Sequence, residues 1–76
     1  MAGPHKTIAR LVLTPRQLEI LRWVAQGKTN REIAALLYLS PGTVRKHLDN
    51  VYAALGVTNR TAAAMRVFAD GPAVLD

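Results

Sequence analysis

Residues 29–55 read TNREIAALLYLSPGTVRKHLDNVYAAL, and this stretch decides the fold because it predicts two helices joined by a tight turn. Thr29 opens a Thr-x-x-Glu capping box, and Ser40-Pro41 marks the start of the second helix. The apolar residues of that helix recur at helical spacing: Val44, Leu48, Val51 and Leu55. Its opposite face is polar and carries Arg45, Lys46, Asp49 and Asn50. This pattern is typical of a helix-turn-helix whose second helix, about residues 41–55, lies in the major groove of duplex DNA.

One further helix is predicted on each side of this pair. The first begins after Thr14 with another capping box and ends at Gly27, which is expected to be left-handed. The last extends over residues 60–69, with Thr58 or Asn59 as its cap. The chain is therefore predicted to be all-α, a compact four-helix domain that contains a helix-turn-helix.

The other large apolar side chains are predicted to pack inside this domain. In the helix that starts at Thr29, the buried stripe is expected to consist of Ile33, Leu36 and Leu37. Three aromatic side chains are assigned to the core or its rim: Trp23, Tyr38 and Tyr52. They do not alternate along a strand, so they do not suggest stacking on a single-stranded nucleic acid.

The length and hydropathy of the chain indicate one domain. It has 76 residues, half of them hydrophobic, which is too apolar for a disordered chain. Residues 11–70 are expected to form the domain, with 1–10 as a flexible leader or linker and 71–76 as a flexible tail. No apolar run approaches the length of a membrane span, and the start lacks the apolar core of a signal peptide. We therefore expect a cytoplasmic protein that does not bind membranes.

The charge distribution is compatible with a nucleic-acid partner. The formal net charge is +5, and the middle of the chain is more basic than this value suggests. Glu32 and Asp49 there oppose six cations, which are Lys28, Arg31, Arg45, Lys46, Arg60 and Arg66. Such an excess suits the neutralisation of phosphates, although charge alone fits a solvated basic surface equally well.

The residues needed for catalysis or metal binding are scarce. Cysteine is absent, so the chain has no disulfide, thiolate metal ligand or thiol nucleophile, and it contains two histidines and five carboxylates. His47 stands beside Leu48 of the buried face and is expected to pack at the edge of its helix. The scattered carboxylates do not suggest a cleft with positioned acid–base groups. The sequence thus predicts no enzyme, no metal and no cofactor.

Four motifs in order resemble a known family. They are LTPRQLEIL at 13–21, GKTNREIA at 27–34, LSPGTVRKH at 39–47 and LGVTNR at 55–60. Together they look like the LuxR/FixJ-type, or GerE-like, DNA-binding domain of bacterial transcription regulators, over about residues 13–68. The resemblance implies four helices, of which the third reads DNA and the fourth commonly forms a symmetric dimer. Such domains usually lie at the carboxyl end of a larger regulator, and this chain is either such a liberated domain or a stand-alone member.

The resemblance also implies which residues meet DNA. Arg45 and Lys46 occupy positions that typically meet base edges. Asp49 joins them as a candidate base contact, although family members often carry a basic residue at its position. Its carboxylate can accept from cytosine N4 or pair with Arg45 or Lys46, and we favour the pairing. Phosphate contacts are expected at helix amino ends and beside the DNA backbone, from Lys28, Thr29, Arg31, Ser40, Thr43 and Arg60.

The expected partners follow from the same resemblance. The small side chains of the fourth helix are assigned to a dimer interface, namely Ala63, Ala64 and Val67. That face is small, so the homodimer is expected to be weak or to form on DNA. Double-stranded DNA is the main partner, and RNA polymerase is a further one. One alternative is a module like sigma-factor region 4. The other is a protein-interaction module that has lost DNA binding, and Asp49 is the residue that favours this second alternative.

Overall fold

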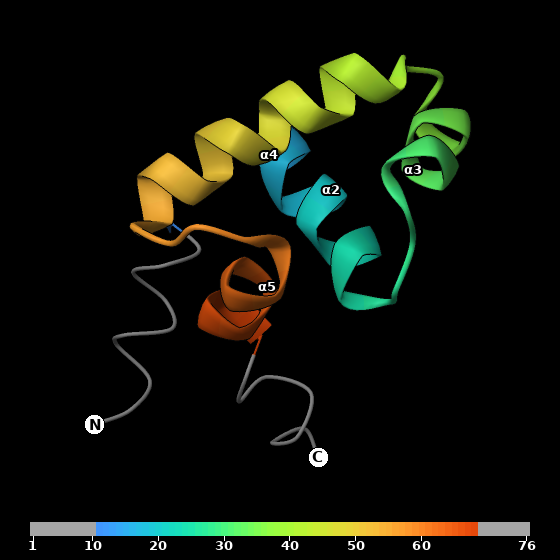
Figure 1. Ribbon diagram of the computed structural model, residues 1–76. Helices are drawn as coiled ribbons and strands as arrows, with labels where there is room; N and C mark the ends of the chain where they lie inside the picture. Colours follow the sequence, from blue (N-terminus) through green and yellow to red (C-terminus); the bar gives the residue numbers. More distant parts are fainter. Residues whose placement is uncertain (1–10, 69–76) are drawn as a thin grey trace.

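The computed structural model describes residues 11–68, which form four helices and no strand (Figure 1). The helices are α2 (Pro15–Ala25), α3 (Asn30–Leu37), α4 (Pro41–Leu55) and α5 (Arg60–Phe68). The all-α prediction is confirmed, and each helix lies where the sequence pattern placed it. The expected leader at 1–10 and tail at 71–76 lie outside the described residues, as does residue 69 at the predicted end of the last helix.

Each helix begins at a side chain that accepts a hydrogen bond from one of the free backbone N–H groups in its first turn. In α2 and α3 the cap is reciprocal, because the threonine hydroxyl accepts from a backbone N–H at 3.1 Å while the partner side chain accepts from the threonine N–H. The reciprocal pairs are Thr14 with Gln17 and Thr29 with Glu32. For α4, Ser40 Oγ accepts from the Thr43 N–H at 3.1 Å, and for α5, Asn59 Oδ1 accepts from the Ala62 N–H at 2.8 Å. The sequence did not decide between Thr58 and Asn59 as the cap of this last helix, and the structure shows that it is Asn59.

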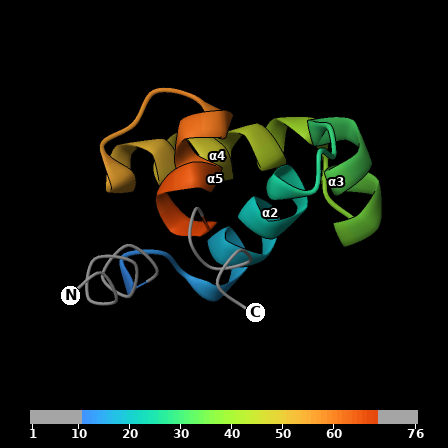
Figure 2. The same ribbon diagram turned by 90° about the horizontal axis from the view of Figure 1, so that it is seen from below.

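α2 occupies the centre of the domain, beneath α4 and between α3 and α5 (Figures 1 and 2). It buries Ile20 and Leu21 completely. The apolar face predicted for α4 packs against this centre, and its four members are at most 6% exposed: Val44, Leu48, Val51 and Leu55. α3 packs against α4 and, less extensively, against α2. The core therefore fixes which face of α4 points outward.

The prediction for α3 was partly wrong. Ile33 is fully buried, but Leu37 is half-buried and Leu36 is 46% exposed. Ala34 is buried instead. Because successive helical residues are separated by about 100°, Ala34 and Leu37 lie on one side of Ile33 and Leu36 lies on the other. The short helix is therefore in contact with the domain along the Ile33–Ala34 edge, which leaves Leu36 in solvent.

Tyr38 was predicted to pack, and this prediction was wrong. Its side chain is 96% exposed, and its backbone ends α3 in the left-handed conformation with φ +59°. Among residues 11–68 it is the one non-glycine residue with positive φ. The turn closes when Leu39 N–H donates to the Ala34 carbonyl at 2.8 Å, a pattern that usually uses glycine. The Cβ of an L-residue in this conformation costs about 1–2 kcal/mol.

Tyr38→Gly is expected to stabilise the domain by about 1 kcal/mol, because glycine adopts the left-handed conformation without steric cost. Urea unfolding followed by circular dichroism gives the free energy of unfolding. Tyr38→Ala is the matched control, since it removes the exposed ring but keeps the Cβ, and its stability is expected within about 0.5 kcal/mol of the wild type. Equal stability of the glycine and alanine variants would contradict a strained turn.

The Glu32 carboxylate links stability to pH. The hydrogen bond from the Thr29 N–H holds the pKa of Glu32 below its ordinary value of 4.5. Desolvation opposes this lowering of the pKa, and the Thr29 hydroxyl and Lys28 add smaller lowering effects. Since the pKa is depressed in the folded state, this stabilisation is present above pH 4.5 and is lost as pH falls through the folded value.

Glu32→Gln is expected to be less stable than the wild type at neutral pH and to approach it in acid, because glutamine keeps the acceptor oxygen but not the charge. Thermal unfolding of both proteins across the acid range measures this difference. Gln17→Ala removes the neutral half of the α2 capping box, so its loss of stability is expected to be independent of pH. A constant difference between Glu32→Gln and wild type would contradict the charge effect.

Candidate nucleic-acid interface

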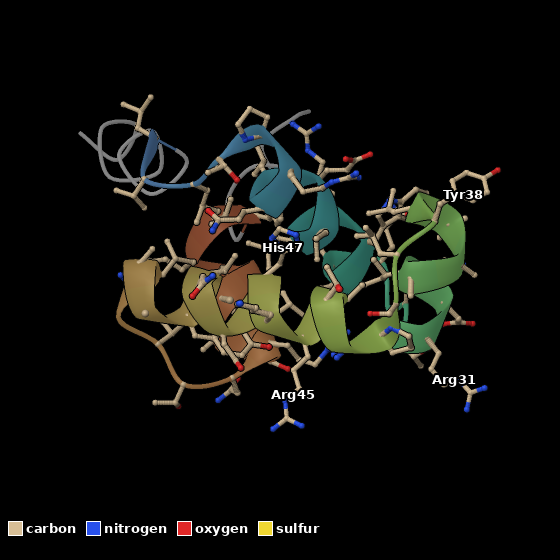
Figure 3. All side chains as sticks on the ribbon, turned by 90° about the horizontal axis from the view of Figure 1, so that it is seen from above. Arg31, Tyr38, Arg45 and His47 are labelled. Carbon is tan, nitrogen blue, oxygen red and sulfur yellow. The ribbon has the colours of Figure 1, made fainter. Side chains whose placement is uncertain are left out.

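The outer face of α4 is polar and accessible. Burial of its apolar seam leaves Arg45, Lys46 and Asp49 exposed, as the sequence predicted. Figure 3 shows the Arg45 side chain directed away from the domain, on the same side as Arg31 of α3. Two separate helices thus present guanidinium groups toward one side of the molecule.

The amino ends of α3 and α4 are also accessible. Thr29 and Arg31 are exposed and Lys28 is half-buried at the start of α3, while Ser40 and Thr43 are exposed at the start of α4. The Ser40 and Thr43 hydroxyls lie 2.9 Å apart and form a hydrogen bond. Free N–H groups and the positive end of the helix dipole make such amino ends suitable for phosphate oxygens.

The cations of this surface are not neutralised by carboxylates. Within the described part of the chain, the one ion pair joins Arg16 to Glu19 on α2 at 3.1 Å. Arg31, Arg45 and Lys46 therefore keep their full charge for an external anion. A surface of this kind attracts polyanions over distances of about the Debye length, roughly 8 Å at physiological salt.

The pairing that we favoured for Asp49 is absent, so that interpretation was wrong. Asp49 forms no ion pair with Arg45 or Lys46, although the helical spacing permits one. Exposed pairs of this type contribute only about 0.3–0.5 kcal/mol net, because ordering two flexible side chains offsets most of the attraction, so little favours the paired geometry. Burial raises the pKa of the nearby Tyr52; the charge of Arg60 opposes this rise, and the charge of Asp49 adds to it less strongly.

His47 lies away from this surface. It is half-buried, and Figure 3 shows it on the opposite flank of α4 from Arg45, on the side toward which Tyr38 rather than Arg31 points. No group of three or more histidine, cysteine or acidic side chains within residues 11–68 is arranged to hold a metal ion. The prediction that His47 packs at the edge of its helix agrees with this position.

Arg60 lies in a setting that the sequence did not reveal. It was predicted to contact a phosphate, but it is half-buried and its guanidinium is bound inside the domain. Nη1 donates to Asn30 Oδ1 and Nη2 donates to the Lys28 carbonyl, both at 2.7 Å. The sequence analysis missed Asn30, because its partner is 30 positions away and no local motif connects the two.

The predicted dimer interface needs correction. Ala63 and Val67 have no exposed surface, because they pack in the core, so they cannot face a second copy. Ala64 is half-buried, while Thr61 and Met65 are exposed, the latter by 59%. An open groove of about 900 Å³ lies beside these residues, between α5, the end of α2 and the start of α3.

Arg66 on α5 has an internal role. Its Nη1 donates to the Leu55 carbonyl at 3.2 Å, at the carboxyl end of α4. Gly56, with φ +69°, ends that helix as predicted. A cation at this end of a helix satisfies a free carbonyl and interacts favourably with the dipole.

None of the helices described is both long and apolar enough to span a bilayer.

Comparison with known proteins identifies the family. The model for bacterial regulatory proteins of the LuxR family matches residues 11–67. YhjB of Escherichia coli (strain K12) is 49% identical over 63 residues, covering 82% of this chain and 32% of YhjB. The HTH-type quorum sensing-dependent transcriptional regulator RpaR of Rhodopseudomonas palustris is 46% identical over 66 residues, covering 87% of this chain and 27% of RpaR. The transcriptional regulatory protein LiaR of Bacillus subtilis is 44% identical over 64 residues, covering 84% of this chain and 28% of LiaR. No solved structure matches the chain.

The match extends over all four helices and includes the polar face of α4. The chain spans about a third or less of the length of these curated relatives. The family is made up of transcription regulators, and the match does not favour the sigma-like or interaction-module alternatives. The chain belongs to the LuxR family of bacterial regulatory proteins, and it carries the helix-turn-helix DNA-binding domain of that family.

Proposed function

We propose that this domain binds specific sequences in duplex DNA and thereby regulates transcription in the bacterial cytoplasm. The observation that carries the proposal is the exposed polar face of α4, beside the accessible amino ends of α3 and α4. The relatives RpaR and LiaR, both named as regulators of transcription, support it.

In this proposal the outer face of α4 reads base edges in the major groove. The Arg45 guanidinium can donate to both O6 and N7 of guanine, and such a bidentate pair contributes about 1–3 kcal/mol of discrimination. Lys46 is the next residue, and its ammonium group can donate hydrogen bonds to base edges as a compact positive charge. Asp49 is an unpaired carboxylate, so it can accept a hydrogen bond from cytosine N4. Facing the DNA backbone instead, its charge would be repelled by the phosphates.

Phosphate contacts hold this helix in register. We assign them to Lys28, Thr29 and Arg31 at the start of α3 and to Ser40 and Thr43 at the start of α4. Hydroxyls, amide groups and cations at helix ends position a protein on the duplex without reading its sequence. Arg60 is left out of this set for the reason developed in the next section.

Two partners besides DNA belong to the proposal. A weak homodimer would use the exposed side of α5, with Ala64 and its neighbours Thr61 and Met65 in place of the buried Ala63 and Val67. RNA polymerase would be in contact with a surface that stays accessible on DNA. Tyr38 is fully exposed and points to the side opposite Arg45, which makes it a candidate for that contact (Figure 3).

Arg45→Ala is expected to weaken binding by about 1–3 kcal/mol and to relax the preferred sequence. Arg31→Ala is the matched control, because it also removes an exposed guanidinium but is assigned to a phosphate. It should weaken all duplexes alike and reduce the slope of log K against log salt by about 0.9. Selection from random duplexes, followed by titration at several salt concentrations, measures both effects.

Two results would contradict this assignment. If Arg45→Ala selects the same motif as the wild type, Arg45 does not read bases. If the wild type binds no duplex from the random pool at low salt, the proposal of DNA binding itself is wrong.

Met65→Glu is expected to reduce cooperative binding to a full site while leaving half-site binding nearly unchanged, because it places like charges across a two-fold axis. Inverted half-sites about one helical turn, roughly 34 Å, apart are the geometry that a symmetric dimer requires. Leu36→Glu adds the same charge to a half-exposed apolar position of another helix, and it should affect half and full sites equally. Equal losses in Met65→Glu would argue against an α5 dimer.

A further inference from the structure

Arg60 connects two parts of the domain that are distant in sequence. It is the first residue of α5, and its guanidinium binds acceptors 30 and 32 positions away at the start of α3. Both hydrogen bonds measure 2.7 Å, which is short for N–H···O and typical of charge-assisted bonds. The planar guanidinium grips two acceptors at once, which a lysine ammonium on a flexible stem cannot reproduce.

The two acceptors lie on either side of Thr29, the residue that caps α3. One is the Lys28 carbonyl in the loop before the helix, and the other is the Asn30 side chain at its first position. Arg60 therefore holds the loop and the helix start together, and ties both to α5. The residues positioned in this way are those assigned to phosphates at this end of α3, namely Lys28, Thr29 and Arg31.

The packing of α3 is centred beyond this end of the helix. The helix is buried mainly through Ile33 and Ala34, which lie about one turn farther on, and its main neighbour is α4. The groove beside α5 is lined by this same loop, including Gly27 and Lys28, so the space there is not filled by side chains. The Arg60 bridge spans the gap between α5 and α3.

We propose that Arg60 is a positioning residue, which holds the amino end of α3 at the distance from α4 that lets both helices engage the duplex together, rather than a residue that contacts DNA itself. The proposal rests on DNA binding as proposed above. Half-burial and two internal acceptors direct the guanidinium inward, toward Asn30 and the Lys28 carbonyl. The bridge also connects α5, where we place the dimer surface, to the phosphate-binding end of α3.

Two single variants separate this role from a phosphate contact. Arg60→Lys keeps the positive charge but loses the two-pronged grip, and Asn30→Ala removes an acceptor without changing any charge. Each is expected to weaken binding to the selected duplex by about tenfold, the effect of losing one charge-assisted hydrogen bond. The double variant is expected to lose no more than about tenfold, because both changes break the same bridge.

The salt dependence of binding distinguishes a positioning residue from a phosphate contact, which a loss of affinity alone does not. Arg60→Gln is expected to leave the slope of log K against log salt unchanged, whereas the control Arg31→Ala reduces it by about 0.9. Affinities are compared at a temperature at which each variant keeps the circular dichroism of the wild type. A reduced slope for Arg60→Gln, or wild-type affinity for Arg60→Lys and Asn30→Ala, would overturn the proposal.

The bridge is also testable without DNA. In amide NMR spectra of the free domain, Arg60→Lys and Asn30→Ala are expected to shift the same resonances, those of residues 28–32, and to speed their hydrogen exchange. Arg31→Ala should leave the exchange rates of these amides near wild type. Unchanged spectra in the first two variants would overturn the positioning role. Failure of the wild type to bind duplexes would refute the proposed function instead, so the two failures are distinguishable.

Discussion

The structure depends first on the burial of one apolar seam of α4. Val44, Leu48 and Val51 are at most 1% exposed, and full burial of each such side chain contributes about 1.5–3 kcal/mol. This seam fixes the rotation of the helix about its own axis. Because one residue changes the direction of a side chain by about 100°, the same packing that hides Val44 places Arg45 at the flank and Lys46 outward. Core packing and presentation of the polar face are thus two consequences of one constraint.

The helix ends contribute in a second way. Thr29 and Ser40 cap α3 and α4 and satisfy N–H groups that would otherwise lack partners. The same ends are the places at which a phosphate finds free amides and a favourable dipole. If DNA binding proceeds as proposed, the same few residues therefore serve both local stability and phosphate binding. Loss of either cap is expected to affect both properties together.

The cationic residues divide by their surroundings rather than by their type. Arg45 and Arg31 point into solvent, whereas Arg60 and Arg66 donate to acceptors inside the domain. Arginine serves both purposes because its guanidinium remains charged and offers up to five donors in a rigid plane. A basic sequence therefore indicates a net attraction for polyanions. Whether a given arginine can contact DNA depends on its surroundings in the folded domain.

The sequence by itself determined the helices, their caps and the outward face of α4. Capping boxes connect residues three positions apart, and a clear apolar period selects one face, so both signals are local. The tertiary structure decided the rest of the candidate site. α5 carries three consecutive alanines, Ala62–Ala64, so its pattern does not distinguish the buried side from the exposed one, and Ala63 and Val67 were misassigned. The partners of Arg60 and the exposure of Tyr38 depend on how the helices cross and on where a turn must close. Contacts across 30 residues leave no periodic trace in the chain, which is why only the packed domain reveals them.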